Sequence, residues 1–448
     1  MSNESARIFR SSLVVAVVAA LSACQDAVAP PMATASSMQS PTVSFSQQSG
    51  KGRQVIDGQY IVVFKDGSSD VDALAQKLNG KAKGKLKHTF KKGIKGFAGA
   101  MTAEAAAELS KDPGVAYVEQ DAVISLDEDT QPETLGVSSL LAAAPKSAPQ
   151  SAPKPTGPKS SGSGSTTSTL GPWTETNAFW NLDRIDQLDA NLDKKYIYNA
   201  TGAGVNVYII DSGIRITHVE FGGRATADFS TINDGHDADG CYWHGTHVAG
   251  IVGGTVYGAA KAVRLHSVRA FDCNGSGSTS DLLIAIEWVI SNAVRPAVTN
   301  MSFTDGLSAA MNDAVARAVA SGIVMVTAAG NSTADACGSS PQSAPEAITV
   351  AASDIYDNLA YYSDFGSCVD IMAPGGATSA WSIDDKSVIA RNGTSMAAPL
   401  VAGAAAMYLQ MNPSATPAMV ASALISRASA QMLGNVPPGT PNLLLRIP

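Results

Sequence analysis

Downstream of residue 177 the chain alternates between short apolar segments and stretches with helical spacing, and this alternation most strongly limits its possible folds. Five segments predict strands: 205–210 (VNVYII), 264–270, 297–302, 323–328 and 348–352. Helical stretches follow most of them. Strands that alternate with helices predict an α/β fold, in which a parallel sheet is covered by helices on both faces. In such sheets, functional groups collect beyond the carboxyl ends of the strands.

Residues 57–126 carry a different pattern, that of a small α+β domain. Segments 59–64 and 115–119 predict its first and last strands, 90–101 predicts two strands broken by glycines, and 71–78 and 103–109 predict helices. The resulting order, β-α-β-β-α-β, indicates a ferredoxin-like fold.

Charge is distributed unevenly between these two regions. Residues 51–124 hold 12 Lys/Arg and 9 Asp/Glu, with seven lysines between Lys81 and Lys95, whereas residues 177–448 hold 14 Lys/Arg and 23 Asp/Glu. Opposite charge favours mutual docking of the two domains, but solvated lysines produce the same pattern, so charge alone leaves docking open. The net charge of −8 argues against a nucleic-acid-binding protein.

Residues 1–24 resemble a bacterial export signal. Arg7 and Arg10 precede the apolar run 13–21, which is too short to span a membrane, and no other segment is long and apolar enough to do so. The tetrapeptide LSAC at 21–24 resembles a lipobox, in which Cys24 would be lipidated; the alternative is ordinary signal-peptidase cleavage nearby.

Two further segments predict flexible chain. Residues 25–56 form an N-terminal segment, and residues 127–176 are rich in Ala, Pro, Ser, Gly and Thr. Such a composition cannot bury a core, so 127–176 is expected to be a linker that holds the maturation site. The linker separates the small domain from a large domain at 177–448.

The cysteines beyond Cys24 are Cys241, Cys273, Cys337 and Cys368. An even number in an exported protein predicts two disulfides, and four cysteines allow three connectivities. No pair has the close spacing of a zinc site, so a structural zinc is not expected.

Four polar residues stand where a serine nucleophile and its helpers would be needed. Asp211 directly follows segment 205–210, His244 begins a helix of small residues, Asn331 follows segment 323–328, and Ser395 begins a helical pattern that continues over 396–409. A neutral histidine can act as a general base, and an N–H at a helix start can stabilise an anion beside a hydroxyl nucleophile. Each residue taken singly has a structural alternative, such as a turn or a helix cap. Together, in the order Asp, His, Asn, Ser, they indicate an enzyme.

The motifs VNVYIIDSGI, HGTHVAG and NGTSMAAP resemble those of the subtilisin superfamily of serine proteases, and within it the proteinase K-like branch that includes aqualysin. The resemblance runs from about residue 180 to the C-terminus, and residues 59–124 look like the inhibitor-type propeptide of these enzymes. It implies that Ser395 attacks the scissile carbonyl, that His244 takes its proton and that Asp211 orients His244. Asn331 and the Ser395 N–H would bind the oxyanion.

The same resemblance implies where a peptide binds. The edge strand for substrate backbone would be Gly275, Ser276 and Gly277, and the walls of the S1 pocket would be Ser302, Thr304 and Asp305 on one side and Ala328, Ala329 and Gly330 on the other. Relatives carry glycines at positions 304 and 305. Two side chains there are expected to narrow S1, and Asp305 to favour a basic residue at P1; the alternative is that Asp305 faces solvent.

The family also implies structural features around the site. The disulfides would be Cys241–Cys273 and Cys337–Cys368. One calcium site would use Asp370 with the carbonyls of Pro345 and Ala347, and a second would use Asp183, Asp186, Gln187 and Asp193. Lys195 stands where relatives offer a further oxygen ligand, which weakens the second prediction, and simple surface acidity is its alternative. No catalytic cofactor is implied.

These observations predict an exported, monomeric serine endopeptidase that acts on polypeptides and is made as a proenzyme. The propeptide would assist folding, block the cleft and be removed by the enzyme itself. A lipid on Cys24 would anchor only the precursor, so maturation would release the enzyme outside the cell. Two alternatives are a non-catalytic binding protein on the same scaffold and a peptide-bond ligase or specialised processing enzyme. Cleavage specificity and the maturation site are left open.

Overall fold

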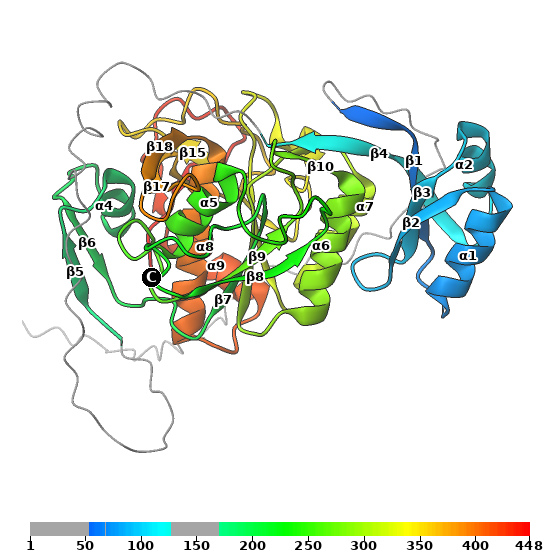
Figure 1. The fold of residues 1–448 in the computed structure, drawn as a ribbon. Coiled ribbons are helices and arrows are strands. Elements are labelled where there is room, and N and C mark those ends of the chain that lie inside the picture. The colour runs from blue at the N-terminus through cyan, green and yellow to red at the C-terminus, as the bar shows by residue number, and fades with distance from the viewer. Residues whose placement is uncertain (1–52, 68, 127–169) are drawn as a thin grey trace, which may run out of the picture. The chain divides into compact units, whose positions relative to one another are not determined.

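The computed structural model describes residues 53–67, 69–126 and 170–448 (Figure 1). The predicted export signal, Cys24 and the linker up to residue 169 lie outside the described residues. Within the described residues, no helix combines the length and the hydropathy that crossing a membrane requires.

The small domain has the predicted order of elements. These are β1 (Gln54–Phe64), α1 (Val71–Lys81), β2 (Lys85–Phe90), β3 (Gly96–Ala100), α2 (Ala103–Leu109) and β4 (Val115–Ser125). The strands pair antiparallel in the order β4-β1-β3-β2, so the ferredoxin-like prediction is confirmed. Strand β1 begins at Gln54, inside the segment predicted to be flexible.

The predicted position of one strand of this domain was wrong. The strand expected to begin at Phe90 ends there instead, and the chain bends over residues 91–95. The backbone N–H groups of Lys91, Lys92 and Gly93 donate to the carboxylate of Glu287, at 2.8, 2.8 and 2.5 Å, rather than entering a ladder.

Strand β1 contributes to two different apolar cores. Successive side chains of a strand point to opposite faces of its sheet. Val62 and Phe64 pack with Leu78 of α1, whereas Ile61 packs in a cluster that includes Ile286 of the large domain. Both faces of the small sheet are therefore buried, and the docking that charge alone left open is present and includes apolar contacts.

The large domain is built on a nine-stranded sheet in the order β19-β20-β16-β15-β13-β11-β7-β9-β8. The strands are β7 (Asn206–Asp211), β8 (Ala225–Ser230), β9 (Arg264–Arg269), β11 (Ala297–Met301), β13 (Val324–Ala328), β15 (Ile348–Ser353), β16 (Ile371–Pro374), β19 (Ser429–Ala430) and β20 (Leu443–Leu444). All neighbours pair parallel except β19 and β20. The five predicted strands are present with small shifts of their ends.

Helices cover both faces of this sheet, as predicted (Figure 1). They are α4 (Trp180–Asp186), α5 (Trp243–Gly253), α6 (Thr279–Asn292), α7 (Ala309–Ala320), α8 (Thr394–Met411) and α9 (Pro417–Arg427). Alternate residues of β7 show the division: Val207 and Ile209 pack in the core with α5, α8 and α9, while Tyr208 and Ile210 pack in the core with α6 and α7.

Short elements complete the large domain. They are β5 (Trp173–Thr176), β6 (Lys195–Tyr198), β10 (Ser276–Ser278), β12 (Asp305–Gly306), η1 (Ala336–Gly338), β14 (Ser339–Ser340), β17 (Gly376–Ala380) and β18 (Val388–Asn392). Strand β5 corrects the predicted linker boundary at residue 176, because β5 pairs with β6 and the Trp173 ring stacks on Tyr198 at 5.6 Å. Aromatic stacking anchors a segment whose composition resembles the linker.

Candidate active site

The carboxyl end of β7 brings Asp211 against His244. Asp211 is the last residue of β7 and His244 the second residue of α5, and Nδ1 of His244 lies 2.9 Å from both carboxylate oxygens of Asp211. Both side chains are buried. A Cβ on Gly245 would lie 2.4 Å from the Gly213 carbonyl oxygen, so only glycine allows the helix to start this close to the strand. The pair can hold one histidine tautomer and stabilise its charged form.

A second histidine on α5 has a structural role. The imidazole of His247 is fully buried, and its Nε2 lies 3.0 Å from the Ile389 carbonyl oxygen. Burial lowers the pKa of His247 to about 3. This histidine is therefore neutral at physiological pH and helps join α5 to β18.

Ser395 is the second residue of α8, and its place is supported by Ser302. In a regular helix the Ser395 carbonyl would accept an N–H from residue 399, which is Pro399 and has none. The Ser302 hydroxyl donates to that carbonyl instead, at 3.0 Å, and the Ser395 hydroxyl donates to the Ser302 carbonyl at 3.3 Å. Ser302, predicted only as a pocket wall, thus also positions the candidate nucleophile.

Asn331 is fixed by the first residue of α8. Its Oδ1 accepts hydrogen bonds from the backbone N–H and the hydroxyl of Thr394, both at 2.9 Å. Because the oxygen of the planar amide is held in this way, its NH₂ group is directed to the opposite side. Thr394 also accepts from the Gly330 N–H at 3.1 Å. Thr394 was missed in the sequence, although its place directly before Ser395 was a signal.

Gln342 joins the two predicted walls of the S1 pocket. Its Nε2 donates to the Phe303 carbonyl at 2.9 Å and to the Ala328 carbonyl at 2.5 Å, and the side chain is buried. The same nitrogen lies 3.3 Å from the hydroxyl of Thr304. The sequence carried no signal for Gln342, since it stands outside every motif.

Of Thr304 and Asp305, the first lies as expected and the second does not. The Thr304 hydroxyl is 3.4 Å from where a Cβ of Gly330 would stand, so Thr304 does lie between the predicted walls. Asp305 instead accepts a hydrogen bond from the Thr279 hydroxyl at 2.8 Å and lies 3.5 Å from Arg53 Nε. The expectation of a solvent-facing Asp305 is wrong, because the residue is 4 % exposed. Burial raises its pKa to about 7.

The predicted edge strand for substrate is paired with the end of the small domain. Strand β10 lies antiparallel to β4, with Ser276 opposite Ser125 and Gly277 opposite Ile124. The Leu126 N–H then donates to the Gly275 carbonyl at 2.8 Å. This edge therefore accepts a polypeptide backbone, here the chain's own.

Carboxylates from β4 also cap two helices of the large domain. Glu119 accepts from the Ser308 hydroxyl at 2.6 Å, before α7, and Asp121 accepts from the Ser280 N–H at 3.0 Å, in the first turn of α6. Acidic groups are favourable at helix N-termini.

The lysine-rich segment contributes less to docking than its charge suggests. Lys87 pairs with Asp281 across the interface, whereas Lys81 and Lys91 pair within their own domain.

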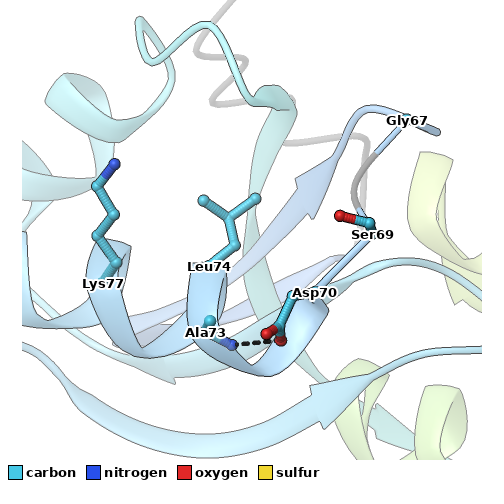
Figure 2. Close-up of a pocket in the computed structure, with 6 residues that line it drawn as sticks. All are labelled: Gly67, Ser69, Asp70, Ala73, Leu74 and Lys77. Carbon is cyan, nitrogen blue, oxygen red and sulfur yellow. Dashed lines mark hydrogen bonds between the residues drawn. The ribbon is translucent and has the colours of Figure 1, made fainter.

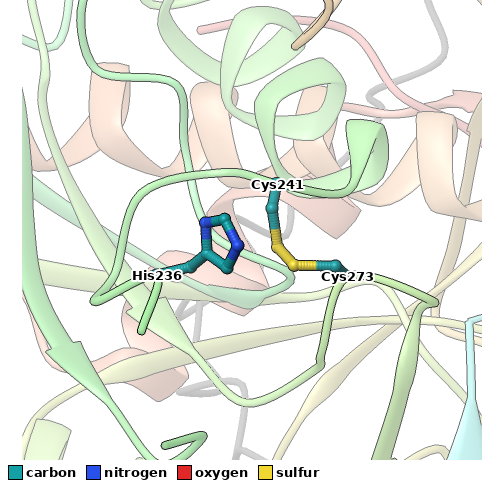
Figure 3. A group of neighbouring side chains, drawn as sticks. All are labelled: His236, Cys241 and Cys273. Carbon is teal, nitrogen blue, oxygen red and sulfur yellow. A yellow bond between two sulfur atoms is a disulfide. The ribbon is translucent and has the colours of Figure 1, made fainter. Parts of the chain in front are cut away.

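The two predicted disulfides are present, as Cys241–Cys273 and Cys337–Cys368. The first joins the segment just before His244 to the segment just before β10. Closing loops of 32 and 31 residues contributes about 2–4 kcal/mol each. His236 lies beside the first disulfide (Figure 3). Because both sulfurs are covalently bonded, they carry no thiolate charge and this group is not a metal site.

The predicted calcium ligands lie in two different settings. Asp370 Oδ2 accepts from the Thr349 N–H at 2.8 Å, and burial raises the Asp370 pKa. In the second set, Asp193 pairs with Lys195 at 2.8 Å. Among the residues that the structure describes, only His236 and the two disulfide cysteines bring three His, Cys, Asp or Glu ligand atoms within 4.8 Å of one another.

The carboxylates of Asp183 and Asp186, in that second set, accept hydrogen bonds from backbone N–H groups of the same domain. Asp183 accepts from the Lys194 N–H at 2.7 Å, and Asp186 accepts from the Ile197 N–H at 2.5 Å. Burial raises the Asp186 pKa to about 6. The neighbouring carboxylates of Asp183 and Asp193 add to this rise, and the second calcium site stays a prediction.

A surface hollow on the small domain lies outside this site (Figure 2). It is lined by Gly67, Ser69, Asp70, Ala73, Leu74 and Lys77. Asp70 accepts from the Ala73 N–H at 2.9 Å as the cap of α1. The Asp70 carboxylate therefore stabilises the start of α1.

A parallel α/β sheet that carries an Asp–His pair and a helix-start serine at its functional edge is the architecture of a serine hydrolase. Residues 202–443 match the model of the subtilase family, peptidase S8, and residues 59–127 match that of the peptidase inhibitor I9 family. The chain belongs to the subtilase family and is a subtilisin-like serine protease with an I9-type propeptide.

Individual relatives agree with this assignment. The chain is 38 % identical to the extracellular serine proteinase of Thermus sp. (strain Rt41A) over 416 residues, which cover 88 % of this chain and 90 % of the relative. It is 38 % identical to the alkaline serine exoprotease A of Vibrio alginolyticus, covering 84 % of this chain and 64 % of that relative. The solved structure of a cold adapted subtilisin-like serine proteinase is 45 % identical, with a TM-score of 0.59, and covers 60 % of this chain and 98 % of its own.

Proposed function

We propose that this protein is an exported serine endopeptidase whose Ser395, His244 and Asp211 form the catalytic triad. The buried contact of 2.9 Å between His244 Nδ1 and Asp211 carries the proposal. His244 takes the proton of Ser395 as its hydroxyl attacks the scissile carbonyl, and Asp211 stabilises the imidazolium that forms. His244 then gives the proton to the leaving amine, and water hydrolyses the acyl-enzyme by the same steps.

Labelling with a fluorophosphonate probe tests the enzyme class directly. The probe should modify Ser395 in the matured protein and should not modify a heat-unfolded sample. A folded, matured protein that takes up no probe contradicts the proposal and favours a non-catalytic binding protein. Incubation with test peptides separates a protease from a peptide-bond ligase. A protease hydrolyses the peptides without joining them, whereas a ligase joins them.

The oxyanion would be bound by the Asn331 side chain and the Ser395 N–H. The first N–H groups of a helix have no partner within that helix, so the Ser395 N–H is available to a developing negative charge. The Asn331 amide is oriented by Thr394, as its 2.9 Å contacts indicate.

Asn331→Ala is expected to lower kcat by about 10²–10³-fold with little change in KM, a magnitude known from subtilisin itself. The interaction forms only as charge develops, so it stabilises the transition state more than bound substrate. Steady-state kinetics on one peptide measure both constants. Asn412→Ala, on the C-terminal side of α8, is the matched control and should keep kcat. An unchanged kcat in Asn331→Ala contradicts the assignment.

The S1 pocket is proposed to accept small residues at P1. Gln342 and Thr304 place side-chain atoms between its walls, and the 2.5 and 2.9 Å contacts of Gln342 hold it there. Ser302 and residues 328–330 would still supply the walls.

Gln342→Ala is expected to shift P1 preference from small to large apolar residues, by about 10-fold or more in kcat/KM ratio, since each added methylene in an opened pocket contributes to binding. A peptide series that varies only at P1 measures the shift. Ser343→Ala, the next residue, is the control and should keep the wild-type preference. The same P1 profile in Gln342→Ala and wild type contradicts a pocket limited by Gln342.

One structural calcium ion is proposed at Asp370 with the carbonyls of Pro345 and Ala347. A half-buried carboxylate whose pKa is raised by burial gains from a bound cation. We expect chelator to lower the melting temperature of wild type, and Asp370→Asn to melt at that lower temperature with or without chelator. Asp354→Asn is the control and should respond to chelator as wild type does. Equal melting of wild type with and without chelator contradicts the site.

Export and maturation complete the proposal. The named relative from Thermus is extracellular, which supports secretion of this enzyme. The I9 domain would assist folding and inhibit the enzyme until it is cut off, since its β4 occupies the substrate edge β10. A lipid on Cys24 would stay with the propeptide. Mass spectrometry of the precursor and of the active monomeric form would identify the new N-terminus and any lipid; an active form that retains lipidated Cys24 contradicts release by maturation.

A further inference from the structure

The side chain of Arg53 fills a polar recess of the large domain. Arg53 precedes β1 and lies outside the residues that match the I9 family, which begin at 59. Its Nη1 lies 3.4 Å from the Leu307 carbonyl oxygen and its Nη2 lies 3.3 Å from the Thr279 hydroxyl. Its Nε lies 3.5 Å from Asp305, and the side chain is only 7 % exposed.

The recess belongs mainly to the large domain. Asp305, Thr279 and the Leu307 carbonyl come from it, and only Glu119, 3.5 Å from Nη2, comes from the small domain. The stem of Arg53 lies against the backbone of β12, because a Cβ on Gly306 would be 2.7 Å from the Arg53 Cβ. Acceptors lie in three directions around Arg53. They match the several N–H donors of a planar guanidinium better than the compact ammonium group of a lysine.

Asp305 needs a cation in this recess. Its carboxylate is 1 % exposed and, besides Arg53, accepts from Thr279. A buried carboxylate is costly without a positive partner. Removal of the propeptide takes away Arg53 and Glu119 together, which leaves Asp305, Thr279 and the Leu307 carbonyl on the released enzyme.

The recess lies beside the path that a substrate follows. Thr279 comes directly after β10, whose last residue, Ser278, pairs with Val123 of β4. On its other side Val123 pairs with Gln54 of β1, the residue that follows Arg53. Strand β4 runs from Val123 towards Leu126, which reaches Gly275. A Cβ on Gly275 would lie 3.0 Å from the ring of Tyr242, two residues before His244, so this end of β10 faces the proposed triad. A substrate with the direction of β4 therefore passes Thr279 with residues that lie upstream of its scissile bond.

We propose that Asp305, Thr279 and the Leu307 carbonyl form a guanidinium-binding subsite, which Arg53 fills in the precursor and an upstream arginine of the substrate fills in the released enzyme. This inference rests on the proposed protease function. It replaces the expectation that Asp305 acts on P1. The subsite lies at the far end of β10 from Gly275, so a basic side chain is selected several residues before the cleaved bond.

The test uses enzyme released from the full-length precursor and peptides that carry Arg, Lys or Met at each of positions P3 to P6. At one of these positions, the peptide with Arg is expected to have a kcat/KM about 10-fold higher than the peptide with Met, and the Lys peptide should lie between them. A 10-fold ratio corresponds to about one hydrogen bond to a charged group. Asp305→Asn should remove the preference, so that the ratio of kcat/KM for Arg over Met peptides falls to about 1. Thr279→Val should reduce it in part. Asp313→Asn, which removes a charge from α7, is the control and should keep it.

The outcomes separate the two levels of the proposal. Cleavage without an arginine preference at any of these positions, or a preference that persists in Asp305→Asn, overturns the subsite and leaves the protease function intact. Failure to cleave any peptide together with failure to react with the fluorophosphonate probe overturns the function itself. If Asp305→Asn is not recovered folded, Thr279→Val decides, and an undiminished preference in that variant overturns the subsite.

Discussion

Ser395→Ala is expected to lower kcat by about 10⁶-fold and to leave the propeptide attached, a magnitude known from subtilisin. The hydroxyl is the atom that forms the acyl-enzyme, so no other group can replace it. If the protease removes its own propeptide, the purified variant should remain a single uncleaved chain. Steady-state kinetics measure the first effect, and gel analysis of the purified protein over time measures the second.

Ser426→Ala is the matched control, because it removes an exposed serine hydroxyl near the end of α9 that donates to the Ala423 carbonyl. This control should mature and hydrolyse peptide as wild type does. Near-wild-type activity in Ser395→Ala would contradict the assignment of the nucleophile. Complete maturation of inactive Ser395→Ala in pure form would contradict self-processing but leave the nucleophile intact.

Asp211→Asn is expected to lower kcat by about 10⁴-fold while the fold is retained. The carboxylate accepts a hydrogen bond from Nδ1 of His244 at 2.9 Å. An asparagine can turn its NH₂ group to that nitrogen, which favours the tautomer whose Nε2 carries the proton and cannot take one from Ser395. Pre-steady-state rates of fluorophosphonate labelling, together with kcat, measure the loss.

The chain offers a second Asp–His pair as control. His266 Nδ1 lies 3.3 Å from Asp228, on the strands β9 and β8 and apart from the triad. Asp228→Asn should keep kcat within a few-fold of wild type. A similar loss in both variants would mean that any broken Asp–His pair disturbs the protein, and Asp211 would then have no special part in catalysis.

The fold was predictable because its elements carry local patterns. VNVYII is apolar on both faces, and Val207 and Tyr208 do enter two different cores, as a central parallel strand requires. The errors occurred where tertiary contacts overrode local pattern. Residues 91–93 turn towards Glu287, and Trp173 is anchored by Tyr198 although its neighbours resemble a linker.

The candidate site was predictable only in part. Asp211, His244, Asn331 and Ser395 stand in short motifs at element ends, so their approximate meeting place follows from parallel topology. Gln342 and Thr394 act through contacts across long sequence separations. Gln342 reaches Ala328 and Phe303 from a segment without a motif, and no local pattern reports such a contact.

The sequence by itself determined the class of fold, the order of domains, the protease family and the residues proposed for catalysis, because periodicity and motifs are local properties of the chain. Only the tertiary structure decided the surroundings of individual side chains. Thr304 and Asp305 are neighbours in sequence, yet one lies against Gly330 and the other meets Thr279 and Arg53. Adjacent residues of extended backbone point in opposite directions, and what each one meets depends on segments that only folding brings together.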